Sequence, residues 1–250
     1  MVAGLFGMLV ACQQSTEAPK EEAAAPAAEA PAEEAAEATG EPGTINVTVK
    51  FEGAAPEAAK LDRKADPYCA KTAKTDPSVL VNGNGTLKNV AVSLKKVRGK
   101  FEVPAENLTL TQSECMYEPR VQTAMVGQKL EITNGDSTLH NVHSYKGEAL
   151  QNWFNRAQPP KAPAITETLS GDIATFKCDV HPWMASYVVL SKHPFHGVTG
   201  DEGAVALANV PSSAKAYTIT TWHEKYGAQE AEVTVEAGKT AEVTVTYKAQ

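Results

Sequence analysis

The 250-residue sequence lacks the features expected of a membrane channel or a nucleic-acid-binding protein. Its N-terminal apolar run covers only residues 2–11, whereas a membrane-spanning helix needs about 20 residues. No basic stripe and no glycine-rich phosphate loop is present, so nothing in the sequence indicates a nucleic-acid or nucleotide partner. Aromatic residues make up only 6% of the chain, and the apolar content therefore lies mostly in Ala, Val and Leu.

A net negative charge is also missing from most of the chain. Residues 1–42 hold eight Glu and one Lys, a net charge of −7, and the whole chain also sums to −7. Residues 43–250 are therefore neutral overall. Gross charge does not select a partner for this part of the protein.

The apolar run at residues 2–11 ends in Leu9-Val10-Ala11-Cys12, which resembles a bacterial lipobox. In lipoproteins of this kind the cysteine carries the lipid and becomes the first mature residue. The resemblance implies a signal remnant over residues 1–12, lipidation of Cys12, and a periplasmic or outer-membrane lipoprotein of the cell envelope. The run lacks a basic beginning, which favours a start codon further upstream. The alternative is a chance cysteine after a short apolar start.

Residues 13–43 consist almost entirely of Ala, Glu and Pro. They include no large apolar residue that could join a core, so we expect a solvated tether. As a flexible coil, such a tether would have a root-mean-square span of roughly 30 Å.

After Gly43 the sequence has the texture of an all-β protein. Short runs of alternating apolar and polar residues are separated by Gly, Asn, Asp and Pro, a pattern typical of a β-sandwich. Asn82 to Gly85 predicts a tight turn. Glu148–Phe154 is the only segment expected to form a short helix. The alternating runs are Ile45 to Phe51, Val90 to Leu94, Leu130 to Ile132, Ile173 to Phe176 and Tyr187 to Leu190.

A second β unit is expected over residues 194–250. Residues 199–245 resemble the small carboxypeptidase-regulatory-like β-sandwich modules, including the strand into Val210-Pro211 and the step Trp222-His223-Glu224. A segment of about 55 residues holds few strands for a complete β-sandwich. We expect it to borrow one from residues 44–52 or from the end of the preceding domain.

The motif that carries chemistry is Cys178-Asp-Val-His181-Pro-Trp-Met184, between two strand-like segments. It places a thiol, an imidazole and a thioether on one loop between rigid strands. Leu139-His140-Asn141-Val142-His143 follows another strand and supplies a second imidazole. One thiolate, two imidazoles and a weak axial thioether suit copper that cycles between Cu(I) and Cu(II).

These residues resemble the cupredoxins, the type 1 blue copper proteins, and among them the amicyanin-like and plastocyanin-like members. The resemblance implies a Greek-key β-sandwich over residues 44–193, strongest over residues 115–192, with one type 1 copper. By matched position His140, Cys178 and His181 are the equatorial ligands and Met184 the axial one, whose alternative is a packed core thioether. Asn141, Pro182 and Trp183 surround this set: Asn141 would brace the Cys loop, and Pro182 removes a backbone N–H near the sulfur.

Cysteine counting supports this assignment. With Cys12 lipidated and Cys178 on copper, Cys69 and Cys115 remain as a pair for a disulfide in an oxidising compartment. The alternatives are a free buried thiol, or Cys115-Met116 as ligands of another metal. No Cys-x-x-x-Cys pair occurs, which argues against a dinuclear purple-copper centre.

Other histidines admit two interpretations. His193, His196 and His223, with Glu224, are candidates for a second metal site. Hydrogen bonding at the junction between the two β units is the interpretation we favour. His143 matches a histidine that binds no metal in the resembled family.

The function that the sequence predicts is electron transfer through copper, with no enzymatic activity, because four ligands leave no open coordination position. The expected partner is a redox protein such as a c-type cytochrome or a membrane oxidoreductase, reached through an exposed edge of His181 and the apolar collar around Pro182 and Trp183. The membrane is expected to be contacted through the lipid, and no nucleic acid is expected. The alternatives are a copper store or chaperone, a surface module that binds a protein or glycan, and a zinc site.

Overall fold

The computed structural model describes residues 1–2 and 40–249. The predicted signal remnant with Cys12, and most of the predicted tether, lie outside these residues. Residues 40–249 fall within one compact unit, residues 35–250.

The chain is all-β, as its alternating pattern predicts. Its one helical segment among the described residues is the 3-10 turn η1, Cys69–Lys71. No helix in the described part is long and apolar enough to cross a membrane. The strands are β1 Gly43–Glu52, β2 Ala91–Lys95, β3 Leu108–Ser113, β4 Met116–Glu118, β5 Val121–Met125, β6 Lys129–Asn134, β7 His140–Lys146, β8 Gln151–Gln158, β9 Ile165–Thr168, β10 Ile173–Lys177, β11 Ala185–Ser191, β12 His196–Val198, β13 Ala204–Val210, β14 Ser213–His223, β15 Gly227–Val235 and β16 Thr240–Lys248.

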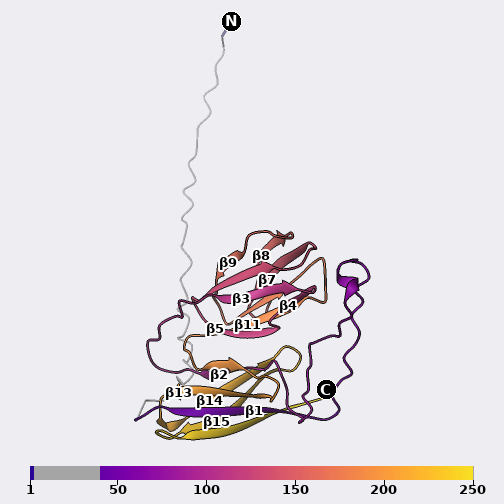
Figure 1. Ribbon diagram of the computed structural model, residues 1–250. Coiled ribbons are helices and arrows are strands. Elements are labelled where there is room, and N and C mark those ends of the chain that lie inside the picture. The colour runs from indigo at the N-terminus through magenta and orange to yellow at the C-terminus, as the bar shows by residue number, and fades with distance from the viewer. Residues whose placement is uncertain (3–39, 250) are drawn as a thin grey trace. The chain divides into compact units, whose positions relative to one another are not determined.

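Four sheets form two sandwiches, each around its own core. The central sandwich packs the sheet β5-β11-β10-β7-β8 against the sheet β4-β3-β6-β9. The terminal sandwich packs β13-β1-β16 against β12-β2-β14-β15. In Figure 1 the central sandwich is the upper body and the terminal sandwich the lower one.

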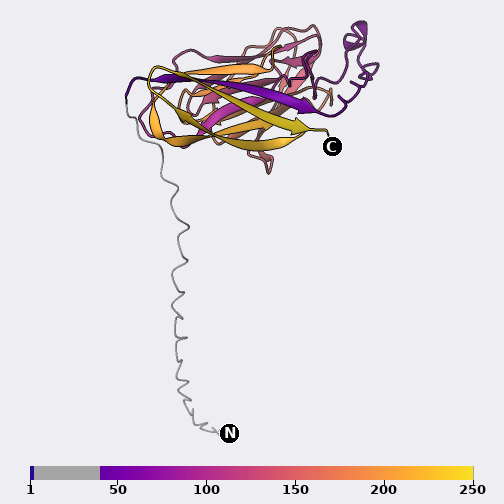
Figure 2. The ribbon, with the colours of Figure 1, turned by 90° about the horizontal axis from the view of Figure 1, so that it is seen from below.

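The terminal sandwich uses strands from both ends of the described chain. β1 runs parallel to β16 over its whole length and antiparallel to β13, and β2 lies between β12 and β14. Figure 2 shows indigo β1 beside yellow β16. Alternate residues of β1, from Ile45 to Phe51, are buried in this core, which is why the strand pairs there.

This pairing corrects the expected division at residues 193 and 194. The segment 44–193 is not a single sandwich, because β1 and β2 complete the terminal one. Residues 194–250 alone would leave apolar faces of β14 and β16 uncovered. Borrowing of residues 44–52 therefore occurs, and β2 is borrowed as well.

A second correction concerns Glu148–Phe154, which forms no helix. Residues from Gln151 onward are strand β8, which pairs antiparallel with β7. Trp153 and Phe154 lie edge to face at 5.0 Å between ring centroids and pack against the central core. Pairing with β7 satisfies the backbone here, so a short local helix has no advantage.

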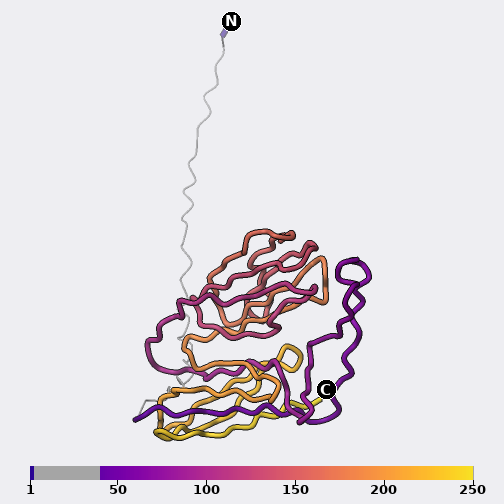
Figure 3. Tube along the Cα trace, viewed as in Figure 1, coloured from indigo at the N-terminus to yellow at the C-terminus, as the bar shows by residue number. Residues whose placement is uncertain are grey.

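The long connection between β1 and β2, residues 53–90, contains η1 and no named strand. Its chain runs out from the terminal sandwich and returns, as the indigo tube in Figure 3 shows. Lys60 bridges to Thr75, and the Leu61 N–H donates to the Lys74 carbonyl at 2.9 Å, so the two limbs of the segment hold each other.

Candidate metal centre

Three neighbouring strands of the central sandwich bring the predicted ligands together. His140 is the first residue of β7, and Cys178 directly follows β10. β10 pairs with both β7 and β11, and the loop 178–184 joins β10 to β11. Two backbone hydrogen bonds close this loop: Cys178 N–H to the Met184 carbonyl at 3.3 Å and Met184 N–H to the His181 carbonyl at 2.9 Å.

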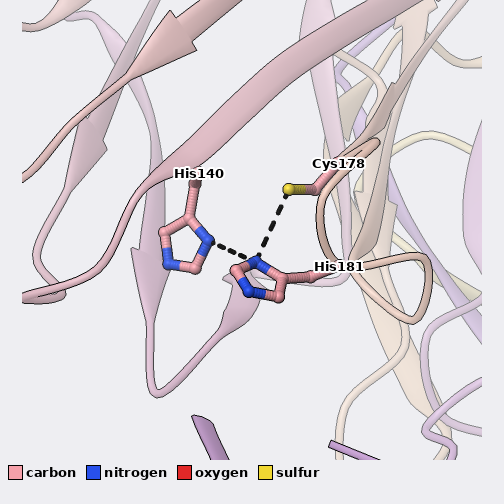
Figure 4. Close-up of side chains that lie close together, drawn as sticks. All are labelled: His140, Cys178 and His181. Atoms are coloured by element: carbon pink, nitrogen blue, oxygen red, sulfur yellow. Dashed lines mark hydrogen bonds between the residues drawn. The ribbon is translucent and has the colours of Figure 1, made fainter. Parts of the chain in front are cut away.

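His140, Cys178 and His181 converge in the interior, as Figure 4 shows. The two Nδ1 atoms lie 2.9 Å apart, and Cys178 Sγ lies 3.7 Å from His181 Nδ1. The three residues are 0%, 2% and 1% exposed respectively. The structure therefore places one thiol and two imidazole nitrogens around one small buried volume.

Met184 is fully buried in the hydrophobic cluster that contains Cys178. Its backbone bonds to Cys178 and His181 fix its place at the end of the loop. This position is compatible with an axial thioether and with core packing alike.

Asn141 holds the Cys178 loop at two points. Its side-chain oxygen accepts the Asp179 N–H, and its own backbone N–H points to Cys178 Sγ at 3.5 Å. This is the bracing role that the resemblance implies. Trp183 donates its indole N–H to the Cys115 carbonyl at 2.9 Å and lies 5.1 Å from the His181 ring, whereas Pro182 is exposed.

Two carboxylates that the sequence did not reveal touch the other edge of each imidazole. Asp136 Oδ2 lies 2.8 Å from His140 Nε2, and Asp66 Oδ2 lies 3.0 Å from His181 Nε2. Asp136 stands four residues before His140 in the Asn-Gly-Asp turn, a spacing that could have suggested the contact. Asp66 is 115 residues from His181, and no local signal links them.

Hydrogen bonds keep Asp66 ionised. Burial acts to raise its pKa, but donors from Thr138 Oγ1, the N–H groups of Tyr68 and Cys69, and His181 together lower the pKa to about 2. An ionised carboxylate can only accept a hydrogen bond, so the proton of His181 sits on Nε2.

Asp136 fixes the same tautomer in His140. Burial lowers the pKa of His140, opposed by its hydrogen bond to Asp136, so the neutral imidazole is favoured. With the proton on Nε2, each ring carries its lone pair on Nδ1, and the two Nδ1 atoms face each other. Two lone pairs at 2.9 Å repel, and a cation between them removes the repulsion. With the thiol alongside, this donor set fits copper.

The edge of the His181 ring, which the motif predicts to be exposed, is covered in the structure. His181 is 1% exposed, because Asp66 and the Cys69–Cys115 disulfide cover its Nε2 side. Cys69 Sγ lies 3.5 Å from His181 Nε2. An exposed His181 edge is therefore wrong for this protein. The exposed apolar residues next to the ligands are Leu139, at 44%, and Val180, at 50%.

The pair Cys69 and Cys115 forms a disulfide, the pairing that cysteine counting favoured. Among the described cysteines Cys178 is free and buried. The disulfide joins η1 to the β3–β4 turn of the central sandwich. It therefore pins the segment between β1 and β2 beside the centre.

The remaining histidines have separate partners. His193 Nε2 bonds the Leu94 carbonyl at 2.9 Å, and His196 Nδ1 bonds Thr123 Oγ1 at 2.8 Å. His223 Nδ1 accepts the Lys225 N–H, and Glu224 pairs with Arg120. None of these residues belongs to a group of metal-competent side chains in the described part. His143 bonds Asp179 at 2.9 Å, outside the centre.

No family model and no curated protein matches this chain. Solved structures do match part of it. Amicyanin from Paracoccus versutus is 19% identical, with a TM-score of 0.31 over 40% of this chain and 97% of its own. A purple cupredoxin from Nitrosopumilus maritimus is 20% identical, with a TM-score of 0.30 over 34% of this chain and 99% of its own.

A copper-containing nitrite reductase from Thermus scotoductus is 14% identical, with a TM-score of 0.32 over 38% of this chain and 25% of its own. These likenesses cover a minority of the chain. The candidate centre rests on its own geometry: two Nδ1 atoms and one thiol, buried together and held by three paired strands.

Proposed function

We propose that this protein binds one copper ion at a type 1 site and passes electrons to or from a redox partner as the ion cycles between Cu(I) and Cu(II). The observation that carries the proposal is the convergence of His140 Nδ1, His181 Nδ1 and Cys178 Sγ in one buried volume. His140, Cys178 and His181 would be equatorial ligands, with the Met184 thioether axial.

Rigidity is the property that suits this centre to electron transfer. His140 stands on a paired strand, and Cys178 and Met184 directly adjoin paired strands. His181 lies in the loop between Cys178 and Met184, which is closed by its own backbone bonds. Little rearranges when the ion changes charge, which keeps the barrier to transfer low. A carrier is favoured over an enzyme, because the ligands fill the coordination shell and leave no position for substrate.

Burial of the ligands favours a carrier over a copper chaperone. A chaperone hands its ion to a partner and needs exposed ligands, whereas these three are at most 2% exposed. No described feature specifically supports protein or glycan binding by the terminal sandwich. Zinc is disfavoured because a thioether is a poor zinc ligand.

The proposed setting is the cell envelope. Lipidation at Cys12 and a membrane-held carrier follow from the lipobox resemblance. The Cys69–Cys115 disulfide supports an oxidising compartment. The partner is a redox protein such as a c-type cytochrome or a membrane oxidoreductase. With His181 covered, it would approach Val180 and Leu139, each one residue from a ligand.

The test is the spectrum of the copper-loaded protein. Oxidised wild type should show an intense blue absorption band and the paramagnetic signature of a cysteine-bound Cu(II). Cys178→Ser should lose the band, because the charge transfer from thiolate sulfur is its source. His143→Asn, a histidine outside the centre, should keep it. A copper-loaded wild type without colour contradicts the proposal.

A further inference from the structure

Part of the segment between β1 and β2 covers the candidate metal centre. We define the cover as residues 59–76; its two limbs are joined by the Lys60–Thr75 bridge and by the Asp76 N–H to the Ala59 carbonyl at 2.8 Å. In Figure 1 this stretch, with the single helical turn η1, stands beside the central sandwich. A surface loop of this length is usually mobile unless other contacts hold it.

Several contacts hold the cover to the central sandwich. The first is the Cys69–Cys115 disulfide. The second is Arg63, 3% exposed, which donates to the Glu114 carbonyl and lies 5.9 Å over the Trp183 ring. The third is the ion pair of Lys74 with Glu114. Together they fix the cover relative to the ligand loop.

The cover reaches the centre through Asp66. Its Oδ1 accepts the N–H of Tyr68 at 2.7 Å and the N–H of Cys69 at 3.2 Å, which shapes the start of η1. Its Oδ2 accepts Thr138 Oγ1 at 2.7 Å and His181 Nε2 at 3.0 Å. The same carboxylate therefore organises the cover and orients a ligand.

We propose that the cover is part of the copper centre: Asp66 is a positioning residue that holds His181 with Nδ1 toward the ion and favours the oxidised state, while the disulfide seals the ligand from solvent. This inference rests on the proposed function. Asp136 makes the equivalent contact on His140, so both imidazoles carry a carboxylate on the far edge.

The physical argument is electrostatic. A carboxylate that accepts the Nε2 proton makes the imidazole a stronger electron donor. Its negative charge also stabilises Cu(II) more than Cu(I), because the attraction scales with the charge of the ion. The ligands are buried, whereas the Asp66 side chain is 18% exposed, so solvent screens this attraction only in part. Asp66 should therefore lower the reduction potential.

The first experiment compares the reduction potentials of copper-loaded wild type, Asp66→Asn and Asp62→Asn. Asparagine at position 66 still offers an oxygen to His181 but removes the charge. We expect the potential of Asp66→Asn to rise while the blue band remains, and its copper affinity to fall about 10–100-fold. Asp62 is exposed on the same segment and touches no ligand, so Asp62→Asn should match wild type.

Two outcomes overturn the inference. One is a blue Asp66→Asn protein with the potential of wild type. The other is an equal rise in Asp62→Asn, which would show a general charge effect instead of a specific contact. If wild type itself lacks the blue band, the proposed function fails and the inference falls with it, so the two failures are distinguishable.

The second experiment measures how fast a chelator removes copper from the folded protein. The double variant Cys69→Ser/Cys115→Ser frees the cover, and Arg63→Met loosens it while leaving the disulfide intact. Both should lose copper faster than wild type, and circular dichroism checks that each remains folded. Folded variants with the wild-type rate would show that the cover does not seal the centre.

Discussion

The position of Met184 fits both a core packing residue and a copper ligand. Two substitutions distinguish these roles. Met184→Ala should cost about 2–5 kcal/mol of folding stability, because the side chain is fully buried. Met184→Leu keeps nearly the same volume and should cost less than about 1.5 kcal/mol. Thermal or denaturant unfolding of the metal-free protein measures both.

The leucine variant also tests whether Met184 is a copper ligand. Leucine cannot donate to copper, so Met184→Leu should keep the colour from Cys178 while raising the reduction potential, since a lost thioether destabilises the more highly charged ion. If the leucine variant has the spectrum and potential of wild type, Met184 is a packing residue only.

Residues near the motif were predictable from sequence, and those that reach it from afar were not. Cys178 and His181 are recognised because the Cys-x-x-His spacing is local, and His140, 38 residues before Cys178, because its His-Asn-Val-His segment resembles that of the cupredoxins. Asp66 was not predicted, because its contact with His181 depends on a segment that a disulfide holds in place. A covered histidine edge could not be anticipated without that segment.

At the scale of elements, a buried ion pair links the two sandwiches. Arg120 precedes β5 of the central sandwich, and Glu224 follows β14 of the terminal one. Arg120 Nε and Nη2 lie 2.7 and 2.6 Å from the two Glu224 oxygens, with side-chain exposures of 11% and 4%. Such two-pronged pairs fix relative geometry as well as charge.

Glu224→Gln should therefore destabilise the protein by about 3 kcal/mol, because it leaves the Arg120 charge without its buried partner. Glu230→Gln is the matched control, since Glu230 pairs with Lys95 at the surface and its loss should cost about 1 kcal/mol or less. Urea unfolding of both variants measures the difference. Equal costs would show that the buried pair does not stabilise the junction.

Strand alternation made most elements predictable, whereas pairing did not follow from the same pattern. Ile45 to Phe51 reads as a strand with one buried face, and β1 has that face. Which sheet it joins depends on partners far along the chain, so the boundary at 193/194 was misplaced. The helix predicted at Glu148–Phe154 does not form. A stretch of seven residues carries no information about the pairing with β7, which decides its conformation.

At the scale of the whole molecule, we expect the free energy of unfolding to fall in mild acid, because two histidines have lowered pKa values. Burial first, and then the charges of Arg120 and Lys225, lower the pKa of His223 to about 4. The ring stacks on Tyr226, 4.9 Å between centroids, and lies 6.1 Å from Tyr247. Burial, with His193, lowers the pKa of His196 to about 4 as well.

Unfolding returns such a histidine to a pKa of about 6.5, so between pH 6.5 and 4 the unfolded chain binds more protons than the folded one. The neutral histidine thus contributes stability that is present above pH 6.5 and lost as pH falls toward 4. Melting temperatures of the metal-free protein should fall over this range. His223→Gln should show a shallower fall, and an identical pH profile would exclude this histidine as a cause.

The pairing of β1 with β16 has a consequence for the order of folding. The first strand of the terminal sandwich needs the last one as its neighbour, so the sheet cannot close until the C-terminal strand is available. Contacts between such distant segments slow folding. The central sandwich holds strands β3 to β11 without interruption, and it can mature first. Until β16 arrives, β1 presents an unpaired edge with one apolar face, which is the state most open to aggregation.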